Sequence, residues 1–356
     1  MKTIILWLTE IFLRSFGGIV IFILEEKMES YQAFISKNNW NKYLQPFKIS
    51  GSTIPFSWVV YSGIILPVLG LMFSNIADYQ KLKSKSLKRK EENQENSTSN
   101  SKNLLEKGRI FKFYHKYLLN DVIDTFLALS LAVVITQVVT NLGKVAVGRP
   151  RPDFFNRCFP EIDLTDPMQI EDQLNEKTTY QVPIDCSAGE NFFVNHTFYD
   201  YSEEDYKKLI KSGRRSFPSG HTSNAFTVGT FMALFIWGKT RTFTKFGNKQ
   251  SWRLFLGITP LLLAAFVGIS RLQDNRHHVE DVFAGAVIGV ISTYYAYRVY
   301  FPCLDNVCCN SSFRQIEWLI ENDKEGQLAN WRLQNEMRLL RGESIKNSNR
   351  VENSQI

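Results

Sequence analysis

The sequence is poor in cysteine, and its few cysteines lack the spacing of a zinc site. Five cysteines occur among 356 residues, and none forms a C-x-x-C pair, so a zinc site is not expected. They fall into two sets, Cys158 with Cys186 and then Cys303, Cys308 and Cys309. Disulfide formation and lipid attachment are therefore the cysteine chemistries to weigh.

Charged residues are scarce in six apolar segments, each about twenty residues long or slightly shorter. These segments cover residues 4–24, 54–76, 122–139, 219–237, 254–269 and 279–300. Such lengths fit helices that cross a bilayer, and the mean hydropathy of −0.18 blends them with very polar loops. A water-soluble helical protein would show polar faces at helical spacing, which these segments mostly lack. We therefore predict an all-α integral membrane protein built as a six-helix bundle.

Several other features are absent. The first segment, residues 4–24, has no cleavage site of small residues, so an uncleaved anchor is predicted in place of a signal peptide. The third to sixth segments have almost no ionisable residues near mid-bilayer, which argues against a transporter. The net charge of +7 is not spread along a recognition helix, so no nucleic-acid partner is expected.

The charges of the loops predict the orientation. Lysines and arginines are concentrated between the second and third segments and between the fourth and fifth. The positive-inside rule places both loops and both termini in the cytosol. The loop of residues 143–217 is acidic between Asp153 and Asp205, so it would face the lumen or the exterior. That compartment permits a disulfide between Cys158 and Cys186.

The sequons divide between the two sides in the same way. Asn195 lies in the acidic loop, where a glycan is permitted. The sequons at Asn96 and Asn310 would be cytosolic and are expected to carry no glycan.

Residues 303–356 form a predicted cytosolic tail with a short amphipathic helix within residues 316–340. The composition after Glu343 is typical of disorder. Cys303, Cys308 and Cys309 lie just past the last apolar segment, where reversible palmitoylation can occur. Ordinary reduced thiols explain these cysteines equally well.

Residues able to carry chemistry gather at one predicted end of the helices. After the third segment, Lys144 and Arg151 supply a point charge and a forked charge, as a phosphoryl group requires. Cations near a helix end also meet lipid headgroups, so this cluster alone is weak evidence.

A second cluster, Pro218-Ser219-Gly220-His221, opens the fourth segment. Free backbone N–H groups at a helix start favour an anion, and glycine lets it approach closely. Proline and serine are also ordinary residues at a helix start, so capping explains Pro218 and Ser219 equally. Capping does not explain His221.

A third cluster lies between the last two segments. Arg271 is a further phosphate-binding candidate. His277 and Asp281 are four residues apart, so on a helix they would share a face. They could be a nucleophile and its orienting carboxylate, or simply an ion pair that caps the helix. The nearby Asp274 and Glu280 are interpreted as solvated or supporting groups.

The order and spacing of these clusters resemble the type 2 phosphatidate phosphatase superfamily. Its motifs are Lys-x6-Arg-Pro, Pro-Ser-Gly-His and Ser-Arg-x5-His-x3-Asp, and every signature position matches. The resemblance covers residues 1–302, and residues 148–155 with the pair His277-His278 are most similar to the diacylglycerol pyrophosphate phosphatase branch. It implies the six-helix fold that this family shares with haloperoxidases.

The resemblance also implies roles for the site residues. His277 would attack phosphorus and form a phosphohistidine, while Asp281 fixes its tautomer. His221 would protonate the leaving group and then activate water. Five residues would hold the phosphate, namely Lys144, Arg151, Ser219, Gly220 and Arg271.

The implied function is a metal-independent lipid phosphate phosphatase without a cofactor. Its substrates would be phosphatidate, diacylglycerol pyrophosphate and related lipids at the lumenal or extracellular face of the plasma membrane or an endomembrane. A polyisoprenyl or sphingoid phosphate phosphatase and a non-catalytic lipid-binding scaffold are the alternatives, and a homo-oligomer remains open. An insertion at residues 161–213 could gate the site, bind a partner or be neutral, and neutrality is the default for an exposed loop.

Overall fold

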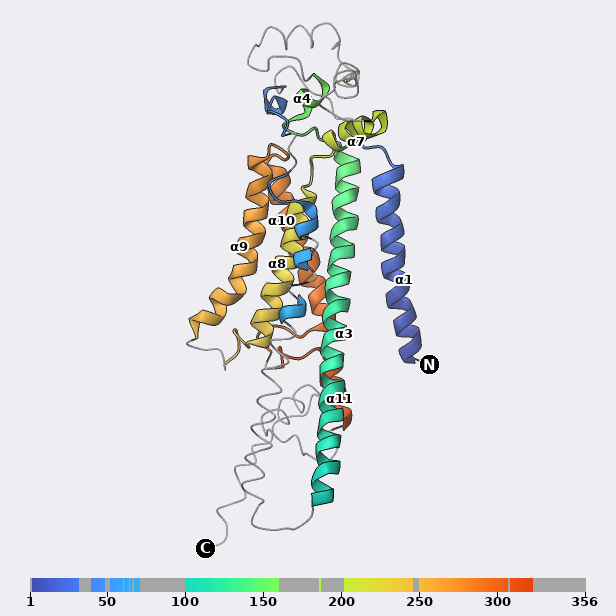
Figure 1. Cartoon of the computed structure of the whole chain (residues 1–356), viewed down its shortest axis with the longest axis vertical. Coiled ribbons are helices and arrows are strands. Elements are labelled where there is room, and N and C mark those ends of the chain that lie inside the picture. Colours follow the sequence, from blue (N-terminus) through green and yellow to red (C-terminus); the bar gives the residue numbers. More distant parts are fainter. Residues whose placement is uncertain are drawn as a thin grey trace. The chain divides into compact units, whose positions relative to one another are not determined.

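The structure, a computed structural model, is all-helical in the part of the chain that it describes. That part comprises residues 2–31, 40–48, 52–59, 61–63, 65, 67–70, 100–159, 186, 202–245, 250–306 and 308–322. Its elements are α1 (Lys2–Phe22), η1 (Ile23–Lys27), η2 (Trp40–Tyr43), α3 (Asn100–Val147), α4 (Phe154–Cys158), α7 (Glu203–Gly213), α8 (Gly220–Lys239), α9 (Ser251–Gln273), α10 (Val279–Tyr300) and α11 (Phe313–Asn322) (Figure 1). The all-α prediction is confirmed for these residues.

Three of these helices contain stretches long and apolar enough to cross a membrane: Leu118–Val147, Ser251–Gln273 and Val279–Tyr300. The last has the bounds predicted for the sixth segment, whereas the first two extend beyond residues 122–139 and 254–269. A shorter apolar helix covers Phe56–Gly70 around three residues that are not described. The count of six membrane spans stays a prediction.

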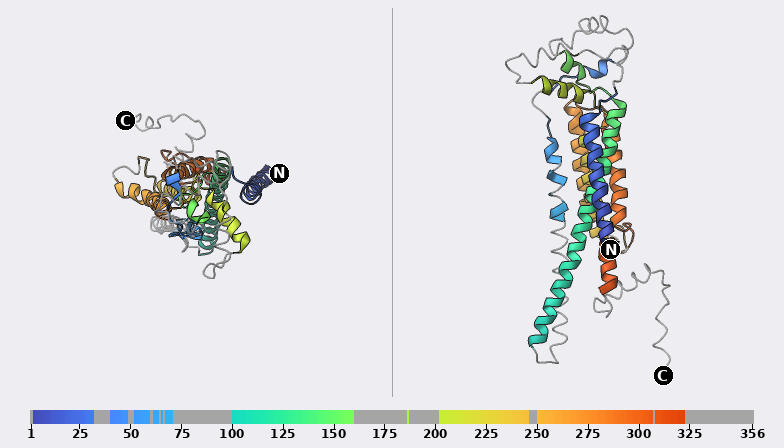
Figure 2. Two further views of the ribbon diagram at one scale, coloured as in Figure 1. Left: turned by 90° about the horizontal axis from the view of Figure 1, so that it is seen from above. Right: turned by 90° about the vertical axis from the view of Figure 1, so that its right-hand side faces the viewer.

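The chain divides into two compact units. The first comprises Met1–Val68, Leu129–Ala233 and Gly257–Tyr297, and the second comprises Leu69–Ala128, Leu234–Leu256 and Arg298–Ile356. Within the first unit, α3, α8, α9 and α10 run side by side in every view (Figure 1, Figure 2). All the residues of the three sequence clusters belong to the first unit.

In the first unit, α8 is joined to α3 by buried polar side chains. The hydroxyls of Thr136 and Thr227 are 2.8 Å apart, and Thr140 donates to Ser223 at 3.0 Å. Polar pairs of this kind join helices in an apolar environment, where hydrophobic burial gives no net drive.

Close packing of α10 on α8 depends on two glycines one turn apart. A Cβ added at Gly285 would come within 2.6 Å of the carbonyl oxygen of Ser219, and one at Gly289 would overlap that of Ser223. Small residues at this spacing let helix backbones approach each other. The beginning of α8 is thereby pressed against the beginning of α10, where the second and third clusters lie.

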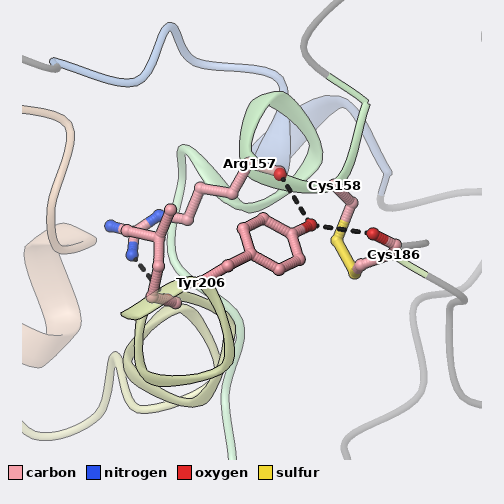
Figure 3. Close-up of a disulfide and its surroundings, with 5 residues drawn as sticks. Arg157, Cys158, Cys186 and Tyr206 are labelled. Atoms are coloured by element: carbon pink, nitrogen blue, oxygen red, sulfur yellow. Dashed lines mark hydrogen bonds between the residues drawn. A yellow bond between two sulfur atoms is a disulfide. The ribbon is translucent and has the colours of Figure 1, made fainter. Parts of the chain in front are cut away.

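A disulfide between Cys158 and Cys186 ties down the chain that follows the first cluster (Figure 3). The hydroxyl of Tyr206, on α7, lies 2.8 Å from the carbonyl oxygen of Cys186 and 3.2 Å from that of Arg157. Arg157 pairs at 2.8 Å with Asp153, and both side chains are fully buried. These contacts fasten α4 to α7. Of the insertion at residues 161–213, only Cys186 and residues 202–213 are described, and Asn195 and Asn96 lie outside the described residues.

In the second unit, two ion pairs join α3 to the end of α8 and to α11. Lys239 pairs with Asp121 at 2.6 Å, and Arg314 on α11 pairs with Asp124 at 2.9 Å. The tail helix is described over Phe313–Asn322, so it begins before the predicted residue 316. The remainder of the predicted stretch to residue 340, and the residues after Glu343, lie outside the described residues.

The three cysteines of the tail differ in exposure. Cys308 and Cys309 are buried, and the Cys309 sulfur lies 3.5 Å from the carbonyl oxygen of Gly238, whereas Cys303 is exposed. Burial shields a thiol from acylation, so palmitoylation stays a prediction for Cys303 and is disfavoured at the other two.

Candidate functional site

The first cluster begins in the last turn of α3 and continues into the chain that follows. The helix continues to Val147, so Lys144 projects from its last turn and not from a loop. Gly148 then turns the chain with a φ of +58°, and a Cβ there would overlap the backbone of Tyr31. Glycine alone meets both demands. After this turn the Arg151 amide donates to the carbonyl oxygen of Gly213 at 2.8 Å. This bond fixes the motif residues that follow Gly148.

The second cluster begins α8, and its serine works as a cap. Ser219 is fully buried, its hydroxyl accepts from the Thr222 hydroxyl at 2.9 Å, and its amide donates to the Asp281 carbonyl oxygen at 3.0 Å. The Ser219 hydroxyl also accepts from the Thr222 amide at 3.5 Å, as a cap does, and phosphate binding stays a prediction. Gly220 leaves space for a neighbour, because a Cβ there would be 3.0 Å from the Lys144 ammonium nitrogen.

The third cluster spans the end of α9, a loop and the start of α10. The loop carries His277, whose side chain is nearly buried. Its Nδ1 lies 2.7 Å from the carbonyl oxygen of Ser216 and 3.8 Å from the nearer Asp281 oxygen. A carbonyl can only accept, so Nδ1 carries the proton and Nε2 keeps its lone pair. Ser216 therefore fixes the tautomer, and the predicted partner Asp281 lies beside the same nitrogen at the longer distance.

Asp281 instead joins all three clusters. Its Oδ2 accepts from the Ser216 hydroxyl at 2.5 Å and from the His278 amide at 2.9 Å, while its Oδ1 accepts from Arg149 at 2.9 Å. Both carboxylate oxygens are thus engaged, and the nearer of them lies 3.8 Å from Nδ1 of His277. Arg149 and Ser216 were not picked out from the sequence. Arg149 had a signal, since it lies two residues before Arg151, whereas nothing distinguished Ser216.

Burial lowers the pKa of His277 to about 4, and the charge of Arg151 adds to the effect, while Asp281 and the Ser216 carbonyl oppose it. The ring is therefore neutral near pH 7, as a nucleophile must be.

This shift predicts how stability depends on pH. A histidine whose pKa falls on folding contributes stability above its unfolded pKa near 6.5, and the contribution is lost as pH falls towards 4. Relative to His277→Gln, the wild type should lose about 2 kcal/mol between pH 7 and about pH 4.5. Thermal unfolding of both proteins in detergent measures the difference, and parallel pH curves would contradict the assignment.

The three candidate cations differ in whether a carboxylate pairs with them. Arg271 is buried and pairs with Asp274 at 3.1 Å. Asp274 also binds Lys48 at 2.7 Å and the amide of Thr53 at 2.8 Å. It is therefore a buried supporting group and not a solvated one, whereas Glu280 is largely exposed, with 69% of its side chain accessible.

Lys144 and Arg151 have no carboxylate in ion-pair contact among the described residues, although Glu25 acts on Lys144 and Asp153 and Asp281 act on Arg151 from farther away. Lys144 forms no ion pair with any described residue, and the buried Nε of Arg151 has no hydrogen-bond partner in the same part of the chain. Burial and the charge of Arg157 lower the pKa of Arg151 to about 9. A cation beside the positive end of a helix is electrostatically unfavourable. An anion bound between Lys144 and the start of α8 would satisfy both.

His221 faces this group of cations. Its Nε2 is buried without a hydrogen-bond partner among the described residues. The charges of Arg271, Arg151 and Lys144 and the ring of His277 are close enough to act on it. A buried, unpaired ring nitrogen costs free energy unless a ligand uses it. The structure therefore brings the predicted histidines and cations together.

No group of three or more histidine, cysteine, aspartate or glutamate side chains in the described ranges could hold a metal ion. The charges that act on His221 come from arginine and lysine side chains, whereas His277 lies between the charges of Arg151 and Asp281. The arrangement can bind an anion, offer it a nucleophilic nitrogen and exchange a proton with it.

Comparison with known proteins gives a family match and several relatives. The model of the PAP2 superfamily matches residues 125–304. Lipid phosphate phosphatase 2 of Arabidopsis thaliana is 39% identical over 189 residues, which are 52% of this chain and 55% of the relative. Diacylglycerol pyrophosphate phosphatase 1 of Saccharomyces cerevisiae is 32% identical over 182 residues, 51% of this chain and 53% of the relative. The chain therefore spans about half the length of the curated relatives it matches. No solved structure matches significantly.

Proposed function

The chain belongs to the PAP2 superfamily, and from this premise we propose that it is an integral membrane enzyme that hydrolyses lipid phosphates. The observation that carries the proposal is the uncompensated positive site formed by Lys144, Arg151 and the first residues of α8, next to the unpaired nitrogen of His221. A phosphoryl group supplies the negative charge that this site lacks.

The charges favour a phosphomonoester. Of the three cations, Arg271 shares the carboxylate of Asp274 with Lys48, whereas Lys144 and Arg151 have no ion-pair partner among the described residues. A phosphomonoester carries close to two negative charges near pH 7, whereas a phosphodiester carries one. The relatives named above are phosphatases of lipids with a terminal phosphate or pyrophosphate, which supports the same substrate class.

In the first step, Nε2 of His277 attacks phosphorus while the bond from phosphorus to the leaving oxygen breaks. The negative charge of the bound phosphoryl group offsets the cations around His221, so this ring holds a second proton, which it donates to that oxygen as a phosphohistidine forms. The Ser216 carbonyl holds the Nδ1 proton in place, and the Asp281 carboxylate stabilises the positive charge that develops on the ring. Lys144 and Arg151 stabilise the equatorial oxygens in the transition state.

In the second step, water replaces the leaving group. His221, now neutral, takes a proton from the water, whose oxygen attacks phosphorus as the bond to His277 breaks. Inorganic phosphate leaves and the histidine is restored. The positive side chains perform the charge stabilisation that metal ions perform in kinases and GTPases, so we propose that the reaction needs no metal or other cofactor.

The lipid substrates we propose are phosphatidate, diacylglycerol pyrophosphate and related lipid phosphates. The site lies at the ends of apolar helices, where a headgroup can enter while its acyl chains stay in the bilayer. We further propose that this end faces the lumen or the exterior and that both termini are cytosolic, because the positive-inside rule assigns the basic residues of 81–90 and 239–253 to the cytosol.

The test is phosphate release by the purified full-length protein in detergent, with a chelator present. We expect hydrolysis of phosphatidate and diacylglycerol pyrophosphate. Lys144→Met should lower kcat/KM about a hundredfold, because it removes a preorganised charge. Lys208→Met is the matched control, since Lys208 is exposed and pairs only with Glu204 among the described residues. A folded protein that releases no phosphate from any lipid phosphate, or only after magnesium is added, would refute the proposal.

A further inference from the structure

Phe56, at the beginning of the apolar helix Phe56–Gly70, lies against His221. The two ring centroids are 5.1 Å apart, and the planes meet at 69°, an edge-to-face contact. Phe56 belongs to none of the three sequence clusters. It is still 40% exposed, so packing does not enclose the ring fully.

Packing over the next two turns holds this ring in place. Val59 packs with Ala225 in a buried cluster, and a Cβ at Gly63 would be 3.0 Å from the Val228 side chain. Positions 56, 59 and 63 thus follow positions 221, 225 and 228 at helical spacing on the two helices. Phe56 faces His221 because the two helices are in register, and not through a chance contact of a loose side chain.

The chain just before Phe56 is fixed as well. The amide of Thr53 donates to Asp274 at 2.8 Å, and Asp274 pairs with the phosphate-binding candidate Arg271. The chain is therefore fixed on both sides of Phe56. Thr53 is held by its bond to Asp274, near the cations, and Val59 is held by its packing against Ala225. It borders the side of the site that His221 occupies.

His221 marks the position of the leaving group, because its proton goes to the leaving oxygen. We propose that Phe56 is a specificity-determining residue that contacts the leaving group and favours an apolar alcohol over a charged phosphate. An aromatic ring excludes water and offers no positive charge. A diacylglycerol leaving group gains from this contact, whereas the phosphatidate that leaves from a lipid pyrophosphate turns its charged phosphate towards a ring that offers no positive charge. This inference rests on the proposed function.

The experiment measures kcat/KM for phosphatidate and for diacylglycerol pyrophosphate with the same acyl chains, in the same detergent. Phe56→Lys should raise the ratio of pyrophosphate to monophosphate hydrolysis about tenfold, because a cation then lies beside the departing phosphate. Phe56→Leu retains an apolar side chain, so the ratio should stay within about threefold of wild type. Trp58→Ala is the control on the same helix, since its side chain is 70% exposed, and it should leave the ratio unchanged.

A ratio from one preparation does not depend on the fraction of protein that is folded, so partial misfolding of a variant cannot imitate the effect. An unchanged ratio in Phe56→Lys, with both lipids hydrolysed by wild type, would overturn this inference and leave the proposed function standing. A wild type that hydrolyses neither lipid would remove the proposed function itself.

Discussion

Replacing His277 with alanine should reduce phosphate release from phosphatidate by about 10⁴-fold or more, the scale of loss when an enzyme's nucleophile is removed. The loss should appear in kcat, because the phosphate-binding cations are unchanged. Wild type incubated briefly with radiolabelled phosphatidate and then denatured should retain label as an acid-labile phosphoprotein, and the variant should retain none. Both measurements report on the same nitrogen.

The adjacent residue is the matched control. His278 takes part through its backbone amide, which donates to Asp281 at 2.9 Å, while its ring lies 3.3 Å from the Pro150 carbonyl oxygen. His278→Ala retains the amide, so it should keep activity within about threefold. Labelling that survives in His277→Ala and disappears in His278→Ala would reverse the assignment of the nucleophile.

Replacing His221 with alanine should reduce phosphatidate hydrolysis by about 10²- to 10⁴-fold, the usual contribution of a general acid or base. Its expected signature is dependence on the leaving group. An alkoxide needs a proton as it leaves, whereas p-nitrophenolate leaves readily without one. In His221→Ala, the rate of the first step should therefore fall much less for p-nitrophenyl phosphate than for phosphatidate. A single-turnover measurement can show this difference.

The second substrate also controls for damage to the fold. Loss of folded protein lowers both reactions equally, whereas loss of the general acid lowers them unequally. Equal losses in the first step for both substrates would contradict the role of His221 as a proton donor. Water activation in the second step affects both substrates, so the comparison must be made before turnover.

The sequence predicted the elements of this fold better than their ends. The bounds of α10 agree with the predicted 279–300 because Glu280 and Asp281 at one end and Arg298 near the other limit an otherwise apolar stretch. The third segment was predicted to end at residue 139, but α3 continues to Val147. Hydropathy falls near Asn141 and Lys144, while the backbone stays helical because Asn141 finds a partner in Glu25 at 2.9 Å.

The residues of the candidate site were predictable because they occur at spacings typical of one family. Their contacts were not. The ring of His277 bonds to the Ser216 carbonyl, 61 residues earlier, and Arg149 reaches Asp281 over 132 residues. No local pattern encodes such pairs, since they depend on how the ends of α3, α8 and α10 meet. Phe56 was missed for the same reason, because a phenylalanine in an apolar segment looks like any lipid-facing residue.

By itself, the sequence determined the all-helical architecture, the helix ends where the chemistry lies and the histidines and cations that take part. Each of these follows from composition and short-range spacing, which act along the chain. The tertiary structure decided which charges are paired, which ring nitrogen of His277 carries the proton and which side chain lies against His221. Those depend on burial and on hydrogen bonds between distant segments, and both arise only when the helices pack. Asp281 shows the difference: the sequence placed it beside His277, and the fold made it the junction of all three clusters.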